Sequence, residues 1–247
     1  MKWAVVTGAG SGIGAALTIS LLRAGIGVVA VGRRADKLNE LRACVLSEEA
    51  QAVAQDMLSR LRTVTADVAS AAGQQAVAAA LPADEPLNFL VNNAGVGVPD
   101  KIENVSRQHF EEALAVNVTG PLFLTQLLLP RLRLCGGEGR VLNIGSGIAD
   151  RVQTGTGTYG VTKKALHRLS LQMAAELADD DRGPEARVWV GYARPGVVDT
   201  EVGTVRATVA LFYAAIRLCD NPMTQAMCRE TNYFPSQSRK EFWQELT

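Results

Sequence analysis

The chain has 247 residues, of which 47% are hydrophobic, so it is long enough for one large domain with a substantial core. Its 25 Lys and Arg balance its 25 Asp and Glu, and this zero net charge argues against nucleic acid as a partner. The four cysteines form no CxxC pair, although Cys219 and Cys228 are spaced closely enough to bond. The two histidines, His109 and His167, lie far apart and are expected on helix surfaces. We therefore expect no metal site and a reducing, cytoplasmic compartment.

Apolar strands alternate with helices along most of the chain. The predicted strands are residues 3–6, 26–31, 62–66, 87–91, 140–144 and 187–192. The predicted helices are residues 15–24, 35–60 with a break near Ser47, 70–81, 106–134 with a kink at Pro121, and 158–177, followed by short helices near 203–219, 222–230 and 237–246. Continuous apolar strands joined by helices predict a parallel sheet that is buried on both faces. Right-handed crossovers make this a doubly wound α/β domain.

No membrane-spanning segment or signal peptide is expected. The first strand begins within a few residues of Met1, which leaves no room for a signal peptide. The apolar run at residues 205–218 is too short to cross a bilayer, and two arginines interrupt it. A membrane is therefore not an expected partner.

A glycine-rich turn follows the first predicted strand. Gly8, Gly12 and Gly14 have the spacing GxxxGxG and precede the first helix. Glycines let the backbone approach a pyrophosphate, which binds at the positive end of the following helix. The turn therefore predicts a dinucleotide site, and the alternative is a tight strand–helix turn without a ligand.

The end of the second strand distinguishes NAD from NADP. An NAD site normally offers an acidic side chain about 20 residues past the glycines, but here Arg33 and Arg34 follow the strand. Because Arg pairs well with phosphate, the 2′-phosphate of NADP(H) is the expected partner. One of the two arginines can instead be a solvent-exposed residue at the start of the next helix, with no role in binding.

Tyr159 and Lys163 lie four residues apart in the helix predicted at 158–177, so their side chains share one face. A nearby positive charge favours a phenolate, whose parent phenol titrates near ~10. Lowering this pKa by roughly three units requires about 4 kcal/mol, which one lysine does not supply in water. Taken alone, the pair is most simply a surface Tyr and Lys.

Further motifs follow the carboxyl ends of the predicted strands, where ligands bind in a doubly wound sheet. In chain order the set is Thr7 to Gly14, Asp67-Val68, Asn92 to Gly95, Asn117, Ser146, Tyr159 with Lys163, and Pro195-Gly196. This set resembles the short-chain dehydrogenase/reductase family, whose signatures include TGxxxGxG, NNAG, a Ser thirteen residues before the Tyr, YxxxK and PG. The resemblance covers residues 3–200 and implies one Rossmann-type domain over residues 1–247.

The resemblance implies four catalytic residues. Tyr159 is then the general acid in carbonyl reduction and the base in alcohol oxidation, and Ser146 donates a hydrogen bond to the substrate oxygen. Lys163 binds the nicotinamide ribose and lowers the pKa of Tyr159. Asn117 helps to hold a water in a proton relay, with a core or capping amide as the alternative.

The resemblance also implies the cofactor-binding residues. They are Gly8, Gly10, Ser11, Gly12, Ile13, Gly14, Arg33, Arg34, Asp67, Val68, Asn93, Ala94, Gly95, Tyr159, Lys163, Pro195, Gly196, Val198 and Thr200. Asp67 and Val68 are expected beside the adenine, whereas Asn92 is more simply structural. Ser11 argues against NADP, because many NADP-using relatives carry Arg or Lys there.

The C-terminal region departs from the family pattern. Residues 195–201 and, more weakly, 229–246 are similar to the sepiapterin reductase and benzil reductase branch, which implies a substrate lid at 197–230. The alternatives for residues 202–247 are an amphipathic helix packed on the core, an interface or a truncation. The usual last strand has no counterpart in the sequence, so the sheet is expected to lack it.

These observations predict an NADPH-dependent carbonyl reductase that acts reversibly on a small-molecule carbonyl or alcohol. Resemblance to the family further implies a homo-oligomer, a dimer or a tetramer. The alternatives are an NAD-dependent alcohol or hydroxysteroid dehydrogenase and a non-catalytic dinucleotide-binding scaffold on the same fold. The sequence does not name the substrate.

Overall fold

The computed structural model describes residues 1–178 and 181–195. All of them belong to one unit of the chain, Met1–Phe212, which is separate from Tyr213–Thr247. The lid predicted at 197–230, the helices predicted beyond residue 203 and the question of a missing last strand lie outside the described residues. So do the candidate cofactor residues Gly196, Val198 and Thr200. The prediction of a single domain over 1–247 stays a prediction.

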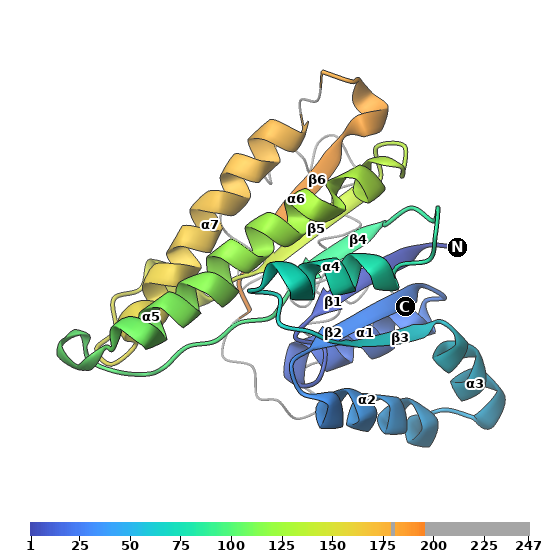
Figure 1. Cartoon of the computed structure of the whole chain (residues 1–247), viewed down its shortest axis with the longest axis horizontal. Helices are drawn as coiled ribbons and strands as arrows, with labels where there is room; N and C mark the ends of the chain where they lie inside the picture. The colour runs from blue at the N-terminus through green and yellow to red at the C-terminus, as the bar shows by residue number, and fades with distance from the viewer. Residues whose placement is uncertain (179–180, 196–247) are drawn as a thin grey trace, which may run out of the picture. The chain divides into compact units, whose positions relative to one another are not determined.

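The described residues form a six-stranded parallel sheet with the order β3-β2-β1-β4-β5-β6, drawn in Figure 1. The strands are β1 (Trp3–Thr7), β2 (Gly27–Gly32), β3 (Leu61–Thr65), β4 (Phe89–Asn92), β5 (Gly139–Ile144) and β6 (Val188–Ala193). The chain moves outward from β1 to β3, returns to β4 and then moves outward the other way. This reversal between β1 and β4 is the switch point beside which ligands bind in doubly wound sheets, so the predicted α/β fold is confirmed.

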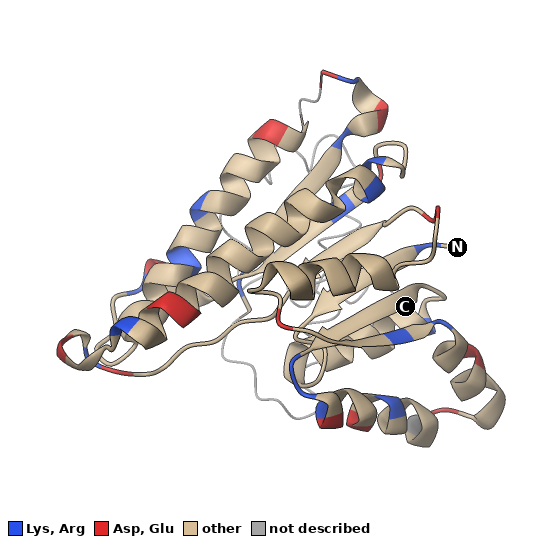
Figure 2. Cartoon of the chain, viewed as in Figure 1, with Lys and Arg blue, Asp and Glu red and all other residues tan. Residues whose placement is uncertain are grey.

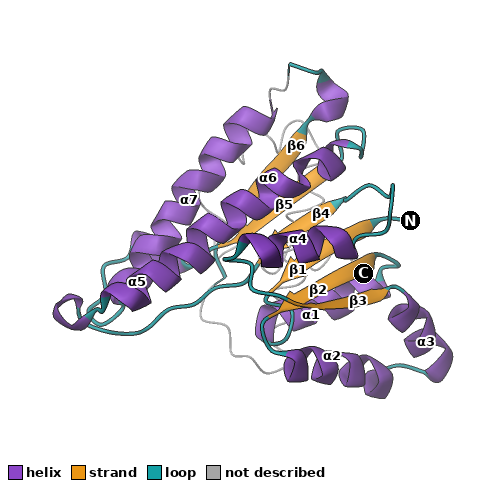
Figure 3. Cartoon of the chain, viewed as in Figure 1, coloured by secondary structure: helices purple, strands orange, loops and turns teal. Residues whose placement is uncertain are grey.

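Helices cover both faces of the sheet, because right-handed crossovers in opposite directions place their helices on opposite faces. The helices are α1 (Gly12–Arg23), α2 (Ala35–Glu48), α3 (Gln51–Ser59), α4 (Ala71–Ala80), α5 (Arg107–Leu114), α6 (Gly120–Arg133) and α7 (Gly157–Ala178), with short 3₁₀ turns at η1 (Ile102–Asn104), η3 (Gly147–Asp150) and η4 (Pro184–Ala186). In Figure 3, α4, α6 and α7 lie in front of the strands. Within residues 1–178 and 181–195, the predicted strands and helices are therefore confirmed, with ends that differ by one or two residues in most cases.

The central strands are apolar because both of their faces are covered. Every residue of β1 and β4 is buried, as is every residue of β2 except its last, Gly32. The core includes Val5, Val29 and Leu90 from these strands and Leu124 and Leu128 from α6. Burying one such side chain contributes about 1.5–3 kcal/mol, so this packing fixes where the strands end.

The helix predicted at 106–134 is divided by a π-helical turn, η2 (Ala115–Thr119). The backbone N–H of Gly120 donates to the carbonyl of Ala115, five residues earlier. Pro121 has no N–H, so it cannot donate to the Asn117 carbonyl as a residue in a regular α-helix does. The expected irregularity at Pro121 is therefore present, one turn earlier than predicted and centred on a candidate site residue.

The segment Arg107–Arg133 is apolar for its length. Its 27 residues have a mean hydropathy of 1.4 over their most apolar window, which is enough by composition and length to cross a bilayer. In this structure 44% of that window is buried within the fold, and α6 packs on β4 and β5. Core helices of globular proteins have the same composition, so this segment is weak evidence for a membrane span.

A buried polar network joins α6 and α7 to the sheet. The Asn92 side-chain amide donates to Asn143 Oδ1 at 2.8 Å and to Thr125 Oγ1 at 3.3 Å. Asn143 in turn donates to Ser170 Oγ at 2.8 Å, and that hydroxyl donates to the Leu166 carbonyl at 2.7 Å. The structural interpretation of Asn92 is consistent with these contacts, because both amide protons are engaged inside the protein.

We expect Asn143→Leu to lower the free energy of unfolding by about 2–4 kcal/mol, because it leaves buried groups of Asn92 and Ser170 without partners. Ser170→Ala, at the end of the network, should lower it by about 1 kcal/mol. Chemical denaturation of the two variants measures both values. Equal, small losses would show that the network contributes little.

Candidate active site

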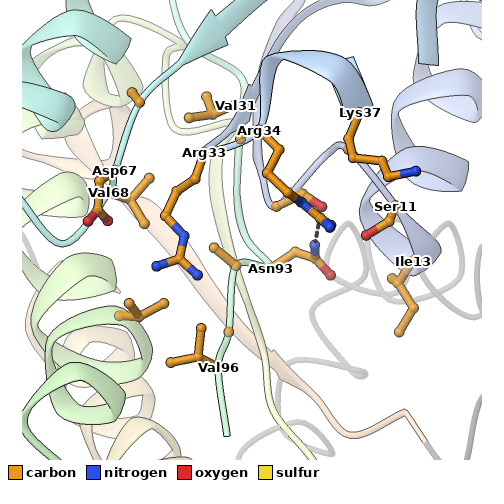
Figure 4. Close-up of a pocket in the computed structure, with 17 residues that line it drawn as sticks. Ser11, Ile13, Val31, Arg33, Arg34, Lys37, Asp67, Val68, Asn93 and Val96 are labelled. Carbon is orange, nitrogen blue, oxygen red and sulfur yellow. Dashed lines mark hydrogen bonds between the residues drawn. The ribbon is translucent and has the colours of Figure 1, made fainter. Parts of the chain in front are cut away.

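Two connected cavities lie at the carboxyl edge of the sheet. The larger, of about 420 Å³, is shown in Figure 4 and is lined by Gly8, Gly10, Ser11, Ile13, Val31, Gly32, Arg33, Arg34, Lys37, Ala66, Asp67, Val68, Asn93, Ala94, Gly95, Val96 and Val116. The smaller, of about 240 Å³, is lined by Ile13, Asn93, Gly95, Ile144, Gly145, Ser146, Tyr159, Lys163 and Pro195. Ile13, Asn93 and Gly95 line both, so the two cavities form one elongated site.

The structure brings most of the predicted site residues to these cavities. Of the candidates within the described residues, all line one of the cavities except Gly12, Gly14 and Asn117. The residues predicted from motifs that are far apart in the sequence are thus brought to one edge of the sheet, while their roles stay a prediction.

Gly14 and Asn93 support the glycine turn from behind. A Cβ added to Gly14 would lie 2.2 Å from the Gly8 carbonyl oxygen, so only glycine lets α1 begin this close to the turn. The Asn93 amide donates to the carbonyls of Thr7 at 2.9 Å and Gly8 at 3.2 Å. The turn is thus tied to the loop after β4, which keeps its backbone in one position.

The first turn of α1 faces the junction of the two cavities. Ser11 is the N-cap residue, yet its side chain makes no capping hydrogen bond, and the first turn contains no acidic residue. The first N–H groups of a helix have no intrahelical partner and carry the positive end of its dipole. This end of α1 therefore suits an anionic group such as a diphosphate.

Three cations line the larger cavity. Arg33 Nη1 pairs with Glu112 Oε1 of α5 at 3.0 Å, and Lys37 Nζ pairs with Glu40 Oε2 of its own helix at 2.6 Å. In Figure 4, Arg33 points between Val68 and Val96, whereas Arg34 and Lys37 point toward the side where Ser11 lies. Sequence reasoning missed Lys37, although it lies one helical turn after Arg33 in the sequence.

Ser146, Tyr159 and Lys163 meet in the smaller cavity. Burial raises the pKa of Tyr159, and a side-chain hydrogen bond with Ser146 opposes that rise. Lys163, only 3% exposed, donates to the Ile144 carbonyl at 2.9 Å, with its Nζ 5.6 Å from the centre of the Tyr159 ring. Burial lowers the pKa of Lys163 to about 8. The lowering of the Tyr159 pKa by Lys163 that the family resemblance implies stays a prediction.

The Asn117 side chain is fully engaged in supporting the site. Its Oδ1 accepts from the Val96 N–H at 2.9 Å, and its two amide protons go to the Val96 carbonyl at 2.7 Å and Thr162 Oγ1 at 2.9 Å. The Thr162 hydroxyl donates to the Tyr159 carbonyl at 2.9 Å. Asn117 thereby links the loop after β4 to the first turn of α7, as the core-amide alternative anticipates.

Gly97 sets the position of the Tyr159 ring and was missed from the sequence. A Cβ at Gly97 would lie 2.5 Å from Cδ2 of that ring, which leaves no room for any side chain. The second glycine in Gly95-Val96-Gly97 is a signal of close approach that could have indicated this contact. Thr162 carried no comparable signal, since its side-chain partner Asn117 is 45 residues away in the sequence.

His167 was expected on a helix surface, and this expectation is wrong. The residue is 7% exposed, and its ring stacks on Tyr192 with centroids 4.5 Å apart. Tyr192 donates to the Lys163 carbonyl at 3.0 Å, and burial raises its pKa to about 12. The pair packs α7 against β6, while His109 is exposed as expected.

Comparisons with known proteins find similar sequences and similar structures. A model of the short chain dehydrogenase family matches residues 2–209. D-erythrulose reductase of Gallus gallus is 32% identical over 203 residues, which cover 82% of this chain and 73% of that one. L-xylulose reductase of Mesocricetus auratus is 32% identical over 200 residues, with 81% and 73% covered. The structure of L-sorbose reductase from Gluconobacter frateurii, complexed with NADPH and L-sorbose, aligns with a TM-score of 0.69 at 28% identity, with 81% of this chain and 70% of that one covered.

We expect Lys163→Met to stabilise the protein at pH 7 by about 1–2 kcal/mol, and this gain should shrink as the pH rises. The unfolded chain keeps the lysine proton up to about pH 10.5, while the folded chain loses it near pH 8. Between these values the unfolded state binds more protons, so wild-type stability rises with pH relative to the variant. Denaturant unfolding of both proteins from pH 7 to 10 measures the difference. A constant difference would contradict the burial of a charged lysine.

Proposed function

The chain belongs to the short-chain dehydrogenase/reductase family, and on this basis we propose that it is an NADPH-dependent reductase that converts a small carbonyl compound to an alcohol, reversibly. The observation that carries the proposal is the grouping of Ser146, Tyr159 and Lys163 at one end of a continuous site. The other end of the site holds three cations, and the uncapped start of α1 lies between the two.

The residues present fit a dinucleotide. The glycine turn exposes backbone beside the α1 N-terminus for the diphosphate. Asp67 and Val68 line the far end of the larger cavity, where the proposal places the adenine. At the opposite end, the proposal has Lys163 and Tyr159 bind the nicotinamide ribose. When bound, the reduced nicotinamide supplies the hydride, and its oxidised form carries the positive charge that favours a phenolate.

Tyr159 is the proposed general acid. Its phenol gives its proton to the carbonyl oxygen as that oxygen becomes an alkoxide, and takes the proton back in the oxidation direction. Before the substrate binds, Ser146 hydrogen-bonds the phenol. With the substrate bound, the single hydroxyl proton of Ser146 is donated to the substrate oxygen instead, which stabilises the developing negative charge. The close approach of Gly97 to the Tyr159 ring restricts where the ring can lie.

Lys163 and Asn117 have supporting roles in the proposal. The Lys163 ammonium has three donors, of which one is used by Ile144 and the others are available to a ribose or a water. The Asn117 side chain is committed to Val96 and Thr162, so a relay water would use the Asn117 carbonyl. Pro121 removes the N–H that normally occupies that carbonyl, which leaves it open for such a water.

The preference for NADPH rests on charge. Arg33, Arg34 and Lys37 line the larger cavity, and Asp67 is the single acid among its lining residues. An acid for the ribose 2′-hydroxyl is missing at the end of β2, where NAD sites normally have one. The alternative, an NAD-dependent alcohol or hydroxysteroid dehydrogenase, is favoured by Ser11, which stands where many NADP-using relatives carry Arg or Lys; the three cations lining the cavity outweigh this single position.

The remaining parts of the proposal concern the cellular compartment, the oligomeric state and the substrate. We place the enzyme in the cytoplasm, as a dimer or tetramer. Within the described residues, Cys44 and Cys135 form no disulfide. The relatives named above act on small ketoses by their names. A carbonyl panel that begins with such ketoses is therefore a reasonable first search for the substrate, and turnover of any carbonyl excludes the scaffold alternative.

We expect Tyr159→Phe to lower kcat for carbonyl reduction by about 10²–10⁴-fold, the range typical of a lost general acid. Affinity for NADPH should change less than about twofold, because the phenyl ring keeps its packing. Tyr192→Phe is the matched control, since it removes a nearby phenol that lines neither cavity, and it should retain activity. Full activity of Tyr159→Phe on every substrate of the panel would remove this residue as the acid.

We expect Arg33→Ala to reduce the preference for NADPH over NADH by about 10- to 100-fold, because a charge-assisted phosphate contact contributes about 1.5–3 kcal/mol. The affinity for NADH should stay nearly the same. Arg34→Ala, measured in parallel, shows which arginine carries the contact. If neither variant changes the ratio of the two dissociation constants, the NADPH assignment is wrong.

A further inference from the structure

One side chain of the larger cavity is held by a residue from another element. Arg33 follows β2, and its guanidinium pairs with Glu112 of α5, which is 79 residues away in the sequence. Figure 2 shows basic residues at the start of α2 and acidic residues on α5. The ion pair therefore joins two elements that border the adenine end of the cavity.

Glu112 is directed to this region by its position on the helix. Val116 lies four residues later and lines the cavity, so the two side chains leave neighbouring turns on the same side. Glu111, the preceding residue, pairs instead with Arg107 of the same helix at 3.4 Å. Adjacent glutamates thus have different partners, and the Arg33 pair is the one that reaches across to the cavity.

The Arg33–Glu112 pair is exposed enough for Arg33 to exchange Glu112 for another anionic partner. Its side chains are 52% and 47% exposed, and pairs of this kind are weak because water and salt screen them. A 2′-phosphate carries more charge than a carboxylate and accepts both arms of a guanidinium. If Arg33 turns to a phosphate, Glu112 loses its partner and its charge remains within a Debye length of the phosphate.

We infer that Glu112 is a specificity-determining residue that competes with the 2′-phosphate for Arg33 and so reduces the preference for NADPH. The inference rests on the proposed function of Arg33. NADH is not affected, because its 2′-hydroxyl is uncharged and leaves the ion pair in place. The chain thereby binds both cofactors with more similar affinities than its three cations alone would give.

The test uses the adenine half of the cofactors, so it does not depend on turnover. Binding of adenosine 2′,5′-bisphosphate and of 5′-AMP to the full-length protein is measured by calorimetry. Glu112→Gln should tighten the bisphosphate about two- to fivefold, the range for an exposed ion pair, and leave 5′-AMP unchanged. The gain should shrink when the salt is raised to roughly 0.5 M.

Glu111→Gln is the matched control, because it removes the same charge one residue away without touching Arg33. If Glu111→Gln tightens bisphosphate binding as much as Glu112→Gln does, the effect comes from the loss of any nearby negative charge, and the inference is wrong. Weaker bisphosphate binding by Glu112→Gln also overturns it, since Glu112 would then position Arg33 for the phosphate. An unchanged affinity overturns it as well.

A double variant separates this inference from the proposed function. In the Arg33→Ala background, Glu112→Gln should have no effect on bisphosphate binding. If Arg33→Ala itself leaves bisphosphate binding unchanged, the proposed phosphate contact fails and the inference fails with it. If Arg33→Ala weakens binding while Glu112→Gln does not tighten it, the contact stands and only the competition is refuted.

Discussion

The buried ammonium of Lys163 is the constraint around which the candidate site is arranged. It lies between α7 and the end of β5, bonded to the Ile144 carbonyl at 2.9 Å. Removing a charge from water is unfavourable, and the pKa of about 8 expresses that cost. The position persists because α7 packs closely on β6 and because the buried Asn92–Asn143–Ser170 network fixes α7 to the sheet.

Three asparagines provide the framework for this arrangement, each in a different way. Asn92 joins β4 to β5 and α6, Asn93 ties the glycine turn to the loop after β4, and Asn117 connects that loop to α7. A buried amide whose donors are all used holds its partners in one geometry, because any shift leaves a polar group unsatisfied. Asn92 and Asn117, which line neither cavity, and Asn93, which lines both, thus hold the site in place.

The two ends of the site differ in their electrostatics. At the Tyr159 end burial dominates, because it raises the pKa of the phenol and lowers the pKa of the Lys163 ammonium. At the Arg33 end the charged side chains are exposed and exchange partners easily. In the proposed function, proton transfer takes place in the first environment, where electrostatic interactions are strong. The proposal assigns discrimination between cofactors to the second, where single charges can be added or lost with little effect on folding.

The amino-acid sequence determined the strands, most helix boundaries and the position of the site, because these depend on local patterns: apolar runs, glycine spacing and motifs at the ends of strands. The tertiary structure decided what each residue does. Gly14 and Asn93 support the glycine turn, His167 is buried against Tyr192, and Arg33 pairs with Glu112. The direction of the Tyr159 pKa shift was also decided there, since burial outweighs one hydrogen bond. Such contacts join residues that are distant in the sequence, and only the packing of strands and helices brings them within reach.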